Sequence, residues 1–178
     1  MNFQSIDEIY TANDEAREVL KALLGKISDE EAGRLADGER WTVAQIVEHI
    51  VTVNDGVFRI CRKLLGKAKE AGTPASKTLN VSDAFLDRSV EVHQVKLQAP
   101  ERVHPTGSVT VEESLAKLDE NRRQMDELRP LFAEFDGDTA KFPHPYFGEI
   151  SAVEWLIMAG GHEARHTNQI RNVLEKLR

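Results

Sequence analysis

The sequence predicts an all-α protein, a four-helix bundle with one long irregular connection between the second and third long helices. Four helix-start signals support this fold, each a Ser or Thr followed three residues later by Glu or Gln: Ser5/Glu8, Thr42/Gln45, Thr110/Glu113 and Ser151/Glu154. The hydroxyl accepts a hydrogen bond from a free backbone N–H of the first turn, and the acid or amide accepts one from the cap residue. Each signal opens a long stretch with apolar residues at helical spacing, and four such stretches predict a bundle.

The first two helices begin at Ser5 and Thr42. The first is expected to run to about Lys26, and its buried candidates are Ile9, Ala16, Val19, Leu20 and Leu23. The second carries one apolar stripe, with charged residues opposite, which is typical of a helix packed on one side. The stripe consists of Ile46, Ile50, Val53, Val57, Ile60 and Leu64, and the opposite face of Glu48, Asp55, Arg59 and Arg62.

Residues 66–109 do not fit a helical pattern, because glycines and prolines interrupt them. One shorter helix, from about Ser82 to Lys96, is expected inside this connection. The third long helix runs from Thr110 to about Phe135, and Pro130 is expected to kink or interrupt it. We expect residues 136–150 to form an irregular loop without a β-hairpin. The last helix begins at Ser151, with a stripe of Trp155, Leu156, Ala159, Ile170, Val173, Leu174 and Leu177.

Length and composition indicate one ordinary globular domain spanning residues 1–178. The net charge of -7, without a Lys/Arg cluster interleaved with aromatics, argues against a nucleic-acid partner. A single cysteine, Cys61, excludes an internal disulfide framework and fits a reducing cytoplasm. The first residues lack the features of a signal peptide, and no apolar run reaches the roughly 18 residues that a membrane span needs. We therefore expect a cytoplasmic protein without a membrane partner.

Three histidines are candidate metal ligands. His162 and His166 are four residues apart in the apolar stripe of the last helix, so both imidazoles point the same way. His49 lies at the margin of the stripe of the second helix, and it joins the pair if the two helices are neighbours. Three neutral histidines with an open position are typical of catalytic zinc, and nickel, iron or manganese also accept this set. The alternative is a purely structural bundle whose histidines are hydrogen-bonded inside the core.

The segment His162-Glu163-Ala164-Arg165-His166 also matches the HExxH pattern of metalloproteases. The context argues against a protease. Only one glutamate, Glu175, follows the second histidine, and Gln169 and Asn172 stand where the longer HExxHxxGxxH pattern needs Gly and His. Glu163 has two interpretations: a catalytic base that approaches a metal-bound water, or a carboxylate paired with an arginine at the bundle edge.

Three further polar side chains are candidates to orient the metal-binding histidines by contacts outside the metal site itself, namely Asn54, Asp55 and Gln169. His144, in the loop before the last helix, is expected either to line the mouth of the site or to anchor that loop. His93 and His104 lie in the irregular connection and receive no role.

Two segments carry a family resemblance. Trp-Thr-Val-Ala-Gln-Ile-Val-Glu-His-Ile opens the second helix, and His-Pro-Tyr-Phe-Gly-Glu-Ile-Ser-Ala-Val-Glu-Trp-Leu leads into Gly-His-Glu-Ala-Arg-His-Thr-Asn-Gln-Ile. Together they resemble the DinB-like superfamily, the damage-inducible, YfiT-like group of metal-dependent enzymes. The resemblance implies a four-helix bundle, often a homodimer, with a divalent metal ion on His49, His162 and His166.

The resemblance also implies an activity. Characterised relatives include transferases that use a low-molecular-weight thiol such as bacillithiol or mycothiol, and a related isomerase; others carry a hydrolase label. This chain has Gln169 where the YfiT-type thiol transferases have an additional histidine. We expect an enzyme acting on small molecules, zinc- or nickel-dependent first, with a metal-activated thiolate as nucleophile. The alternatives are a hydrolase that activates water and a non-catalytic stress-response bundle that binds a metal or a small ligand.

Overall fold

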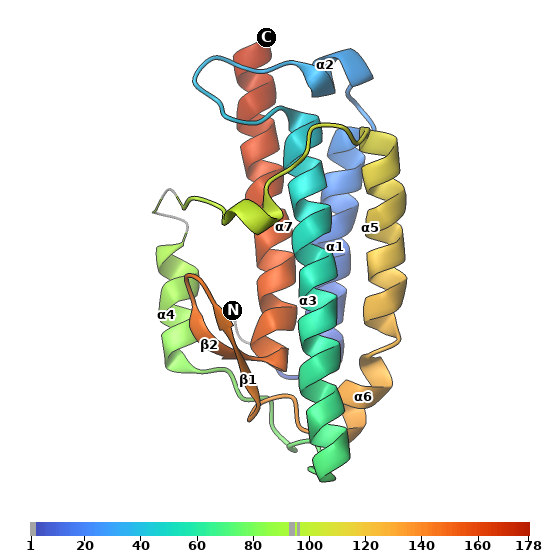
Figure 1. Ribbon diagram of the computed structural model, residues 1–178, viewed down its shortest axis with the longest axis vertical. Helices are drawn as coiled ribbons and strands as arrows, with labels where there is room; N and C mark the ends of the chain where they lie inside the picture. The colour runs from blue at the N-terminus through green and yellow to red at the C-terminus, as the bar shows by residue number, and fades with distance from the viewer. Residues whose placement is uncertain (1–2, 93–94, 96) are drawn as a thin grey trace.

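The computed structural model describes residues 3–92, 95 and 97–178. Within these residues, four long helices run side by side as a bundle, and a layer made of a short helix and a two-stranded hairpin covers one side of it (Figure 1). The helix α7 packs against both α1 and α3, and α3 packs against α5. The predicted all-α bundle is confirmed.

In chain order the elements are α1 (Ile6–Leu24), α2 (Asp29–Gly33), α3 (Val43–Ala71), α4 (Asp83–Glu91), the 3-10 helix η1 (Glu101–Val103), α5 (Val111–Asp126), α6 (Arg129–Glu134), β1 (Lys141–His144), β2 (Gly148–Ser151) and α7 (Ala152–Leu177).

The predicted caps begin all four long helices. Thr42, Thr110 and Ser151 form reciprocal capping boxes with the residue three positions later. At the start of α1, Ser5 accepts a hydrogen bond from the Glu8 backbone, but the Glu8 carboxylate accepts one from the Gln4 backbone instead of returning to Ser5. A further capping box, Ser28 with Glu31, opens the short α2, which the sequence analysis did not predict.

The helix α3 is longer than predicted. The expectation that the helical pattern stops at Gly66 is wrong, because α3 continues to Ala71 and ends at Gly72, whose φ of 65° is left-handed. One glycine inside a helix costs about 1 kcal/mol, and burial of Leu64, Leu65 and Ala68 on either side of Gly66 offsets that cost.

The third predicted helix is interrupted, as expected. The helix α5 ends at Asp126 and α6 begins at Arg129, with Pro130 in its first turn, where the missing N–H has no helical partner to lose. The short helix expected inside the long connection is α4, which ends at Glu91. Its predicted end near Lys96 and His93 lie outside the described residues.

The segment before α7 differs from the expectation. Residues predicted to form a loop without a hairpin form β1 and β2, which pair in antiparallel register, with Phe142 opposite Ile150 and His144 opposite Gly148. The His144 ring closes the turn, because its Nδ1 accepts hydrogen bonds from the backbone N–H groups of Tyr146 and Phe147, each at 3.1 Å. The turn also has residues that favour a three-residue hairpin loop, with Pro145 at its start and Gly148 at its end, where φ is 76° and left-handed.

Two hydrophobic clusters fill the bundle, one around Tyr10 and Trp155 and the other around Leu20 and Val173. Most of the predicted apolar stripes lie in them. Val19 does not: it is 46% exposed, so its prediction as buried is wrong. The helix α1 borders α7 and turns its other face to solvent, and Val19 lies on that face.

A buried polar layer separates the two clusters along the helices. Arg17 of α1 donates to both carboxylate oxygens of Glu163 on α7, with an Nε–Oε2 distance of 2.7 Å, and to the Leu118 carbonyl of α5 at 2.7 Å. Asn54 of α3 donates to Glu163 Oε1 at 2.6 Å. One residue from each long helix therefore takes part, and this layer fixes the relative height of α3 and α7.

Candidate metal centre

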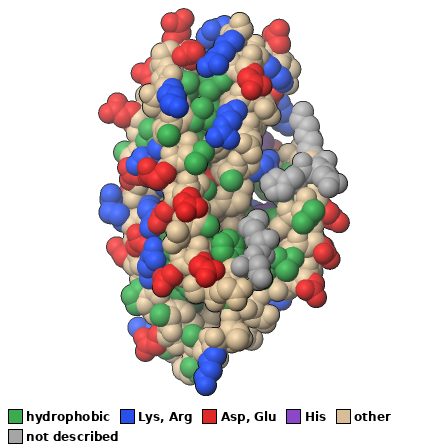
Figure 2. Space-filling view, turned by 180° about the vertical axis from the view of Figure 1, so that it is seen from behind, with side chains coloured by type: hydrophobic (Ala, Val, Ile, Leu, Met, Phe, Trp, Pro, Cys, Tyr) green, Lys and Arg blue, Asp and Glu red, His purple; other side chains and the backbone are tan. Residues whose placement is uncertain are grey.

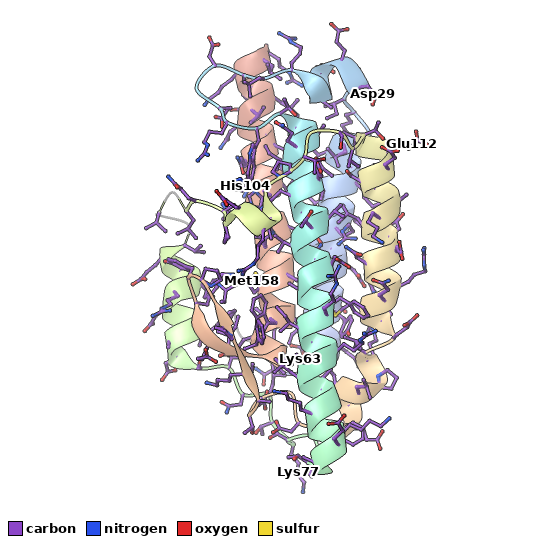
Figure 3. All side chains as sticks on the ribbon, in the orientation of Figure 1. Asp29, Lys63, Lys77, His104, Glu112 and Met158 are labelled. Carbon is purple, nitrogen blue, oxygen red and sulfur yellow. The ribbon has the colours of Figure 1, made fainter. Side chains whose placement is uncertain are left out.

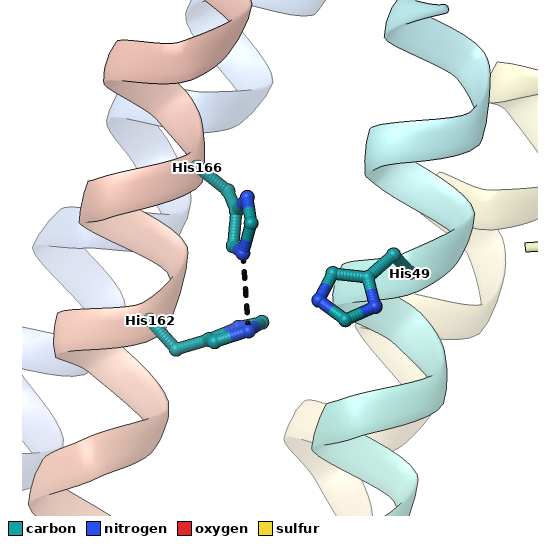
Figure 4. Close-up of side chains that lie close together, drawn as sticks. All are labelled: His49, His162 and His166. Atoms are coloured by element: carbon teal, nitrogen blue, oxygen red, sulfur yellow. Dashed lines mark hydrogen bonds between the residues drawn. The ribbon is translucent and has the colours of Figure 1, made fainter. Parts of the chain in front are cut away.

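The three predicted histidines meet between α3 and α7. His49 faces His162 and His166 across the gap between the two helices (Figure 4). The ring centroid of His49 lies 5.1 Å from that of His162 and 5.0 Å from that of His166, and the ligand atoms of the three rings all lie within 4.8 Å of one another. The side chains converge because His162 and His166 are one turn apart on α7, and α3 runs beside that face.

Two of the rings are held by hydrogen bonds from their outer nitrogens. His49 Nδ1 lies 2.7 Å from the carbonyl oxygen of Val103, and His166 Nδ1 lies 2.7 Å from Oε1 of Gln169. Since both partners are acceptors, each Nδ1 carries the proton and donates. The lone pair of each ring is then on Nε2. A hydrogen bond of this kind, from one ring nitrogen to a protein acceptor, fixes the tautomer of metal-binding histidines.

The third ring, His162, completes the cluster. Its Nε2 lies 3.2 Å from Nε2 of His166, and its Nδ1 is buried without a hydrogen-bond partner among the described residues. An ion bound at about 2.0–2.1 Å to tetrahedral nitrogen ligands separates those nitrogens by roughly 3.3 Å. The separation of these two Nε2 atoms fits two ligands of one divalent ion.

Burial keeps these imidazoles neutral. Desolvation lowers the pKa of His49, although its hydrogen bond to Val103 opposes the shift. Desolvation, followed by repulsion from the neighbouring histidines, lowers the pKa of His162 well below its ordinary value, and desolvation with the nearby Arg165 charge does the same for His166. Neutral imidazole is the form that binds metal, so near pH 7 the cluster needs to lose no protons on binding.

The other predicted site residues have different surroundings. Gln169 contacts His166, as described above. Glu163 and Asn54 belong to the buried layer with Arg17, and Asp55 pairs with Arg59 one turn further along α3. Glu163 thus pairs with an arginine, as the second interpretation of this residue expected. The pair lies inside the bundle and not at its edge. Its role as a catalytic base stays a prediction.

Sequence reasoning missed the residues that hold the His49 ring. Glu48 was assigned to the solvent face of its helix, but it is buried and binds the long connection. Its carboxylate accepts hydrogen bonds from the backbone N–H and hydroxyl of Thr106, at 2.8 and 2.7 Å, and from the Gly107 N–H at 2.9 Å. These bonds hold the segment that carries the Val103 carbonyl over His49. No sequence spacing signals this contact, because the partners of Glu48 are backbone groups of an irregular segment.

Aromatic contacts cover the same side of the cluster. The Trp41 ring packs on His49 at a centroid distance of 4.9 Å, and His104 packs on Trp41 at 5.8 Å. His104 lies at η1, outside the bundle helices (Figure 3), and it is exposed. Through Trp41 it belongs to the aromatic cover of His49.

A pocket of about 70 Å³ adjoins the cluster and includes His162 in its lining. Its walls come from α4, the hairpin and α7, and Met158 lies between α7 and the layer formed by α4 and the hairpin (Figure 3). By the same measure a water molecule needs ~10–15 Å³, so the pocket has room for several waters or a fragment of similar size. From the opposite side, histidine side chains are visible in a recess of the surface beside the undescribed residues (Figure 2).

Fold and site together define a class: four-helix bundles that place three histidines, two of them buried, between the second and last long helices. The sequence pattern of the DinB superfamily matches residues 12–170, and the chain belongs to this superfamily. It is similar to the uncharacterized protein YuaE of Bacillus subtilis (strain 168), with 24% identity over 155 residues, which cover 85% of this chain and 88% of YuaE. It also resembles the crystal structure of TT2238, a four-helix bundle protein, with a TM-score of 0.62 and 25% identity, covering 94% of this chain and 98% of the other.

The described helices include none that combines the length and the apolar character needed to cross a membrane.

Proposed function

We propose that this protein binds a divalent metal ion through His49, His162 and His166 and acts as a metal-dependent enzyme on small molecules. The observation that carries the proposal is the fixed orientation of the rings. Val103 and Gln169 hold two outer nitrogens, so that neutral Nε2 atoms converge in a buried space. Zinc and nickel fit a three-nitrogen site first, and iron or manganese is also compatible.

The residues around the cluster support a role in small-molecule chemistry. A divalent ion with an open position lowers the pKa of a bound water or thiol and so supplies a nucleophile near neutral pH. The chain itself contributes rigid ring positions, through Glu48 and Gln169, and a mostly apolar pocket against His162 that can present a second molecule. We favour transfer to or from a low-molecular-weight thiol, with hydrolysis as the alternative reaction. In either case Gln169 orients His166.

The first test is metal content. Protein purified without a His-tag is analysed for metals, together with His49→Ala and, as a control, Asn168→Ala, which removes an exposed polar side chain of α7. We expect about one divalent ion per wild-type chain, the same for the control, and loss of the ion in His49→Ala. A chelator should also lower the melting temperature, since an ion bound only by the folded state adds stability. Wild-type protein without stoichiometric metal, and with a melting temperature that chelator leaves unchanged, would favour the purely structural bundle.

The second test is turnover. Metal-loaded protein is given low-molecular-weight thiols with a panel of electrophiles, and separately a panel of esters and amides without thiol. Thiol-dependent consumption of an electrophile supports the transferase, and thiol-independent consumption supports the hydrolase. Binding of a thiol or small ligand without any conversion favours the non-catalytic alternative. The cytoplasmic location and a homodimer stay predictions, for which localisation in cells and the molar mass in solution are the measurements.

A further inference from the structure

The pocket beside the cluster combines apolar walls with one end that carries polar N–H groups. Phe85 of α4, Phe147 of the hairpin, and Ile157 and Met158 of α7 form the apolar walls. None of the described residues that line it is acidic, and the hydroxyl of Ser89 already donates to the Phe85 carbonyl at 2.7 Å. The character of a ligand is therefore decided by the two remaining polar residues besides His162, namely Arg165 and His144.

Arg165 is a half-buried cation without a carboxylate partner. No ion pair in the described part of the chain includes it, whereas Arg17, Arg59, Arg122 and Arg129 each pair with an acid. Its Nη2 donates to Nε2 of His166 at 2.7 Å. The lone pair of His166 Nε2 can accept the hydrogen bond from Arg165 or bind a metal ion, but it cannot do both. With a metal ion on His166, the Arg165 guanidinium loses this acceptor at the edge of the pocket, and a buried donor left without an acceptor is costly.

His144 offers a second donor. Because its Nδ1 accepts two backbone hydrogen bonds, the proton of the neutral ring is on Nε2. Within the described residues, this Nε2–H has no hydrogen-bond partner in the protein, and the ring lines the pocket. Burial and the nearby charge of Arg102 lower the pKa of His144 to about 4, so the neutral tautomer persists near pH 7.

The surroundings of the pocket are cationic in a chain whose net charge is -7. Arg102 lies close enough to act on His144, and Arg88 donates to the Tyr146 carbonyl at 2.7 Å beside the hairpin turn. A cationic edge next to apolar walls attracts a molecule that has an anionic group and an apolar body.

We infer that this pocket binds a small carboxylate, or an equivalent oxyanion, with its acidic oxygens on Arg165 and His144 and its apolar body against Phe85 and Phe147. As an assignment of substrate class, the inference rests on the proposed metal-dependent function. As a binding site it needs no metal ion, because only one nitrogen of the Arg165 guanidinium contacts His166 and the group has further N–H donors. Arg165 is then a residue that determines specificity and positions the substrate beside His162.

The test compares benzoate with benzamide, which have nearly the same shape and differ in charge. Affinities for the metal-free protein, prepared with chelator, are measured by NMR titration. We expect benzoate to bind at least tenfold more tightly than benzamide. Arg165→Met should weaken benzoate binding at least tenfold and leave benzamide unchanged, and Arg165→Lys should have an intermediate effect. The matched control is Arg171→Met, which removes an exposed arginine of the same helix and should bind benzoate like the wild type.

Equal affinities of the two probes, or unchanged benzoate binding by a folded Arg165→Met variant, would overturn the inference, as would the absence of binding by either probe. The same titrations on zinc-loaded protein distinguish a failure of the anion site from a failure of the proposed metal-dependent function. Zinc should tighten benzoate binding further in the wild type, and Arg165→Met should still reduce it, because a carboxylate held by zinc alone would not depend on Arg165. If the protein takes up no zinc, the metal-dependent function fails, while the metal-free titrations still decide whether the pocket selects anions.

Discussion

The buried pair between Arg17 and Glu163 provides the sharpest test of the bundle structure. The two side chains are only 9% and 4% exposed, and Glu163 accepts hydrogen bonds from both Arg17 and Asn54. Glu163→Ala leaves a buried guanidinium without a counter-ion and an amide without its acceptor. Breaking such a pair from one side costs about 3–5 kcal/mol. For a chain of this size, this corresponds to a fall in melting temperature of roughly 6–20 °C.

The assay is urea unfolding followed by circular dichroism, with Asp119→Ala as the matched control. Lys21 and Asp119 also join α1 to α5, but their side chains are 35% and 47% exposed, so the control should lose only about 0–1 kcal/mol. Replacing both Arg17 and Glu163 by methionine should recover part of the loss, because no uncompensated charge remains, while the Asn54 amide still lacks its acceptor. Glu163→Ala with the same unfolding free energy as Asp119→Ala would refute the claim that this layer holds the helices in register.

Three other predictions concern packing, the metal site and pH. Gly66→Ala should raise the unfolding free energy by about 0.5–1 kcal/mol, because an added methyl group meets open space. Gly160→Ala should lower it by about 1–2 kcal/mol, because there the methyl group meets Asn13. Urea unfolding of both variants should therefore give changes of opposite sign. Gln169→Ala should weaken metal binding about 10–100-fold in a chelator competition, because the imidazole it orients is released, and unchanged affinity would contradict that role. Burial lowers the pKa of His144 to about 4, so below about pH 6.5 the unfolded chain binds more protons at this residue than the folded chain does. The unfolding free energy of the metal-free protein should therefore fall as the pH is lowered from 6.5 to 5. A constant unfolding free energy across that window would contradict this.

The fold was largely predictable because its main determinants are local. Capping residues at Thr42, Thr110 and Ser151 act within one turn, and apolar stripes identify the buried faces. The errors arose where tertiary contacts outweigh local preference. Buried neighbours carry α3 past Gly66, and the side chain of His144 closes a hairpin turn whose Pro145 and Gly148 were assigned to an irregular loop.

The site was predictable in part for the same reason. The four-residue spacing of His162 and His166 places both rings on one face of any helix. The approach of His49 depends on which helices are neighbours, and helical spacing alone does not determine that. The contacts of His49 with Val103 and of Glu48 with Thr106 involve backbone groups of the long connection, so no residue pattern predicts them. The same holds for Arg165, whose missing carboxylate partner is visible only in three dimensions.

The two halves of this site belong to different parts of the chain. The histidines are on α3 and α7, whereas much of the pocket wall is supplied by α4 and the hairpin, which cover the bundle from outside. Exchanging the covering layer between related bundles would therefore change the pocket wall and leave the three-histidine framework intact.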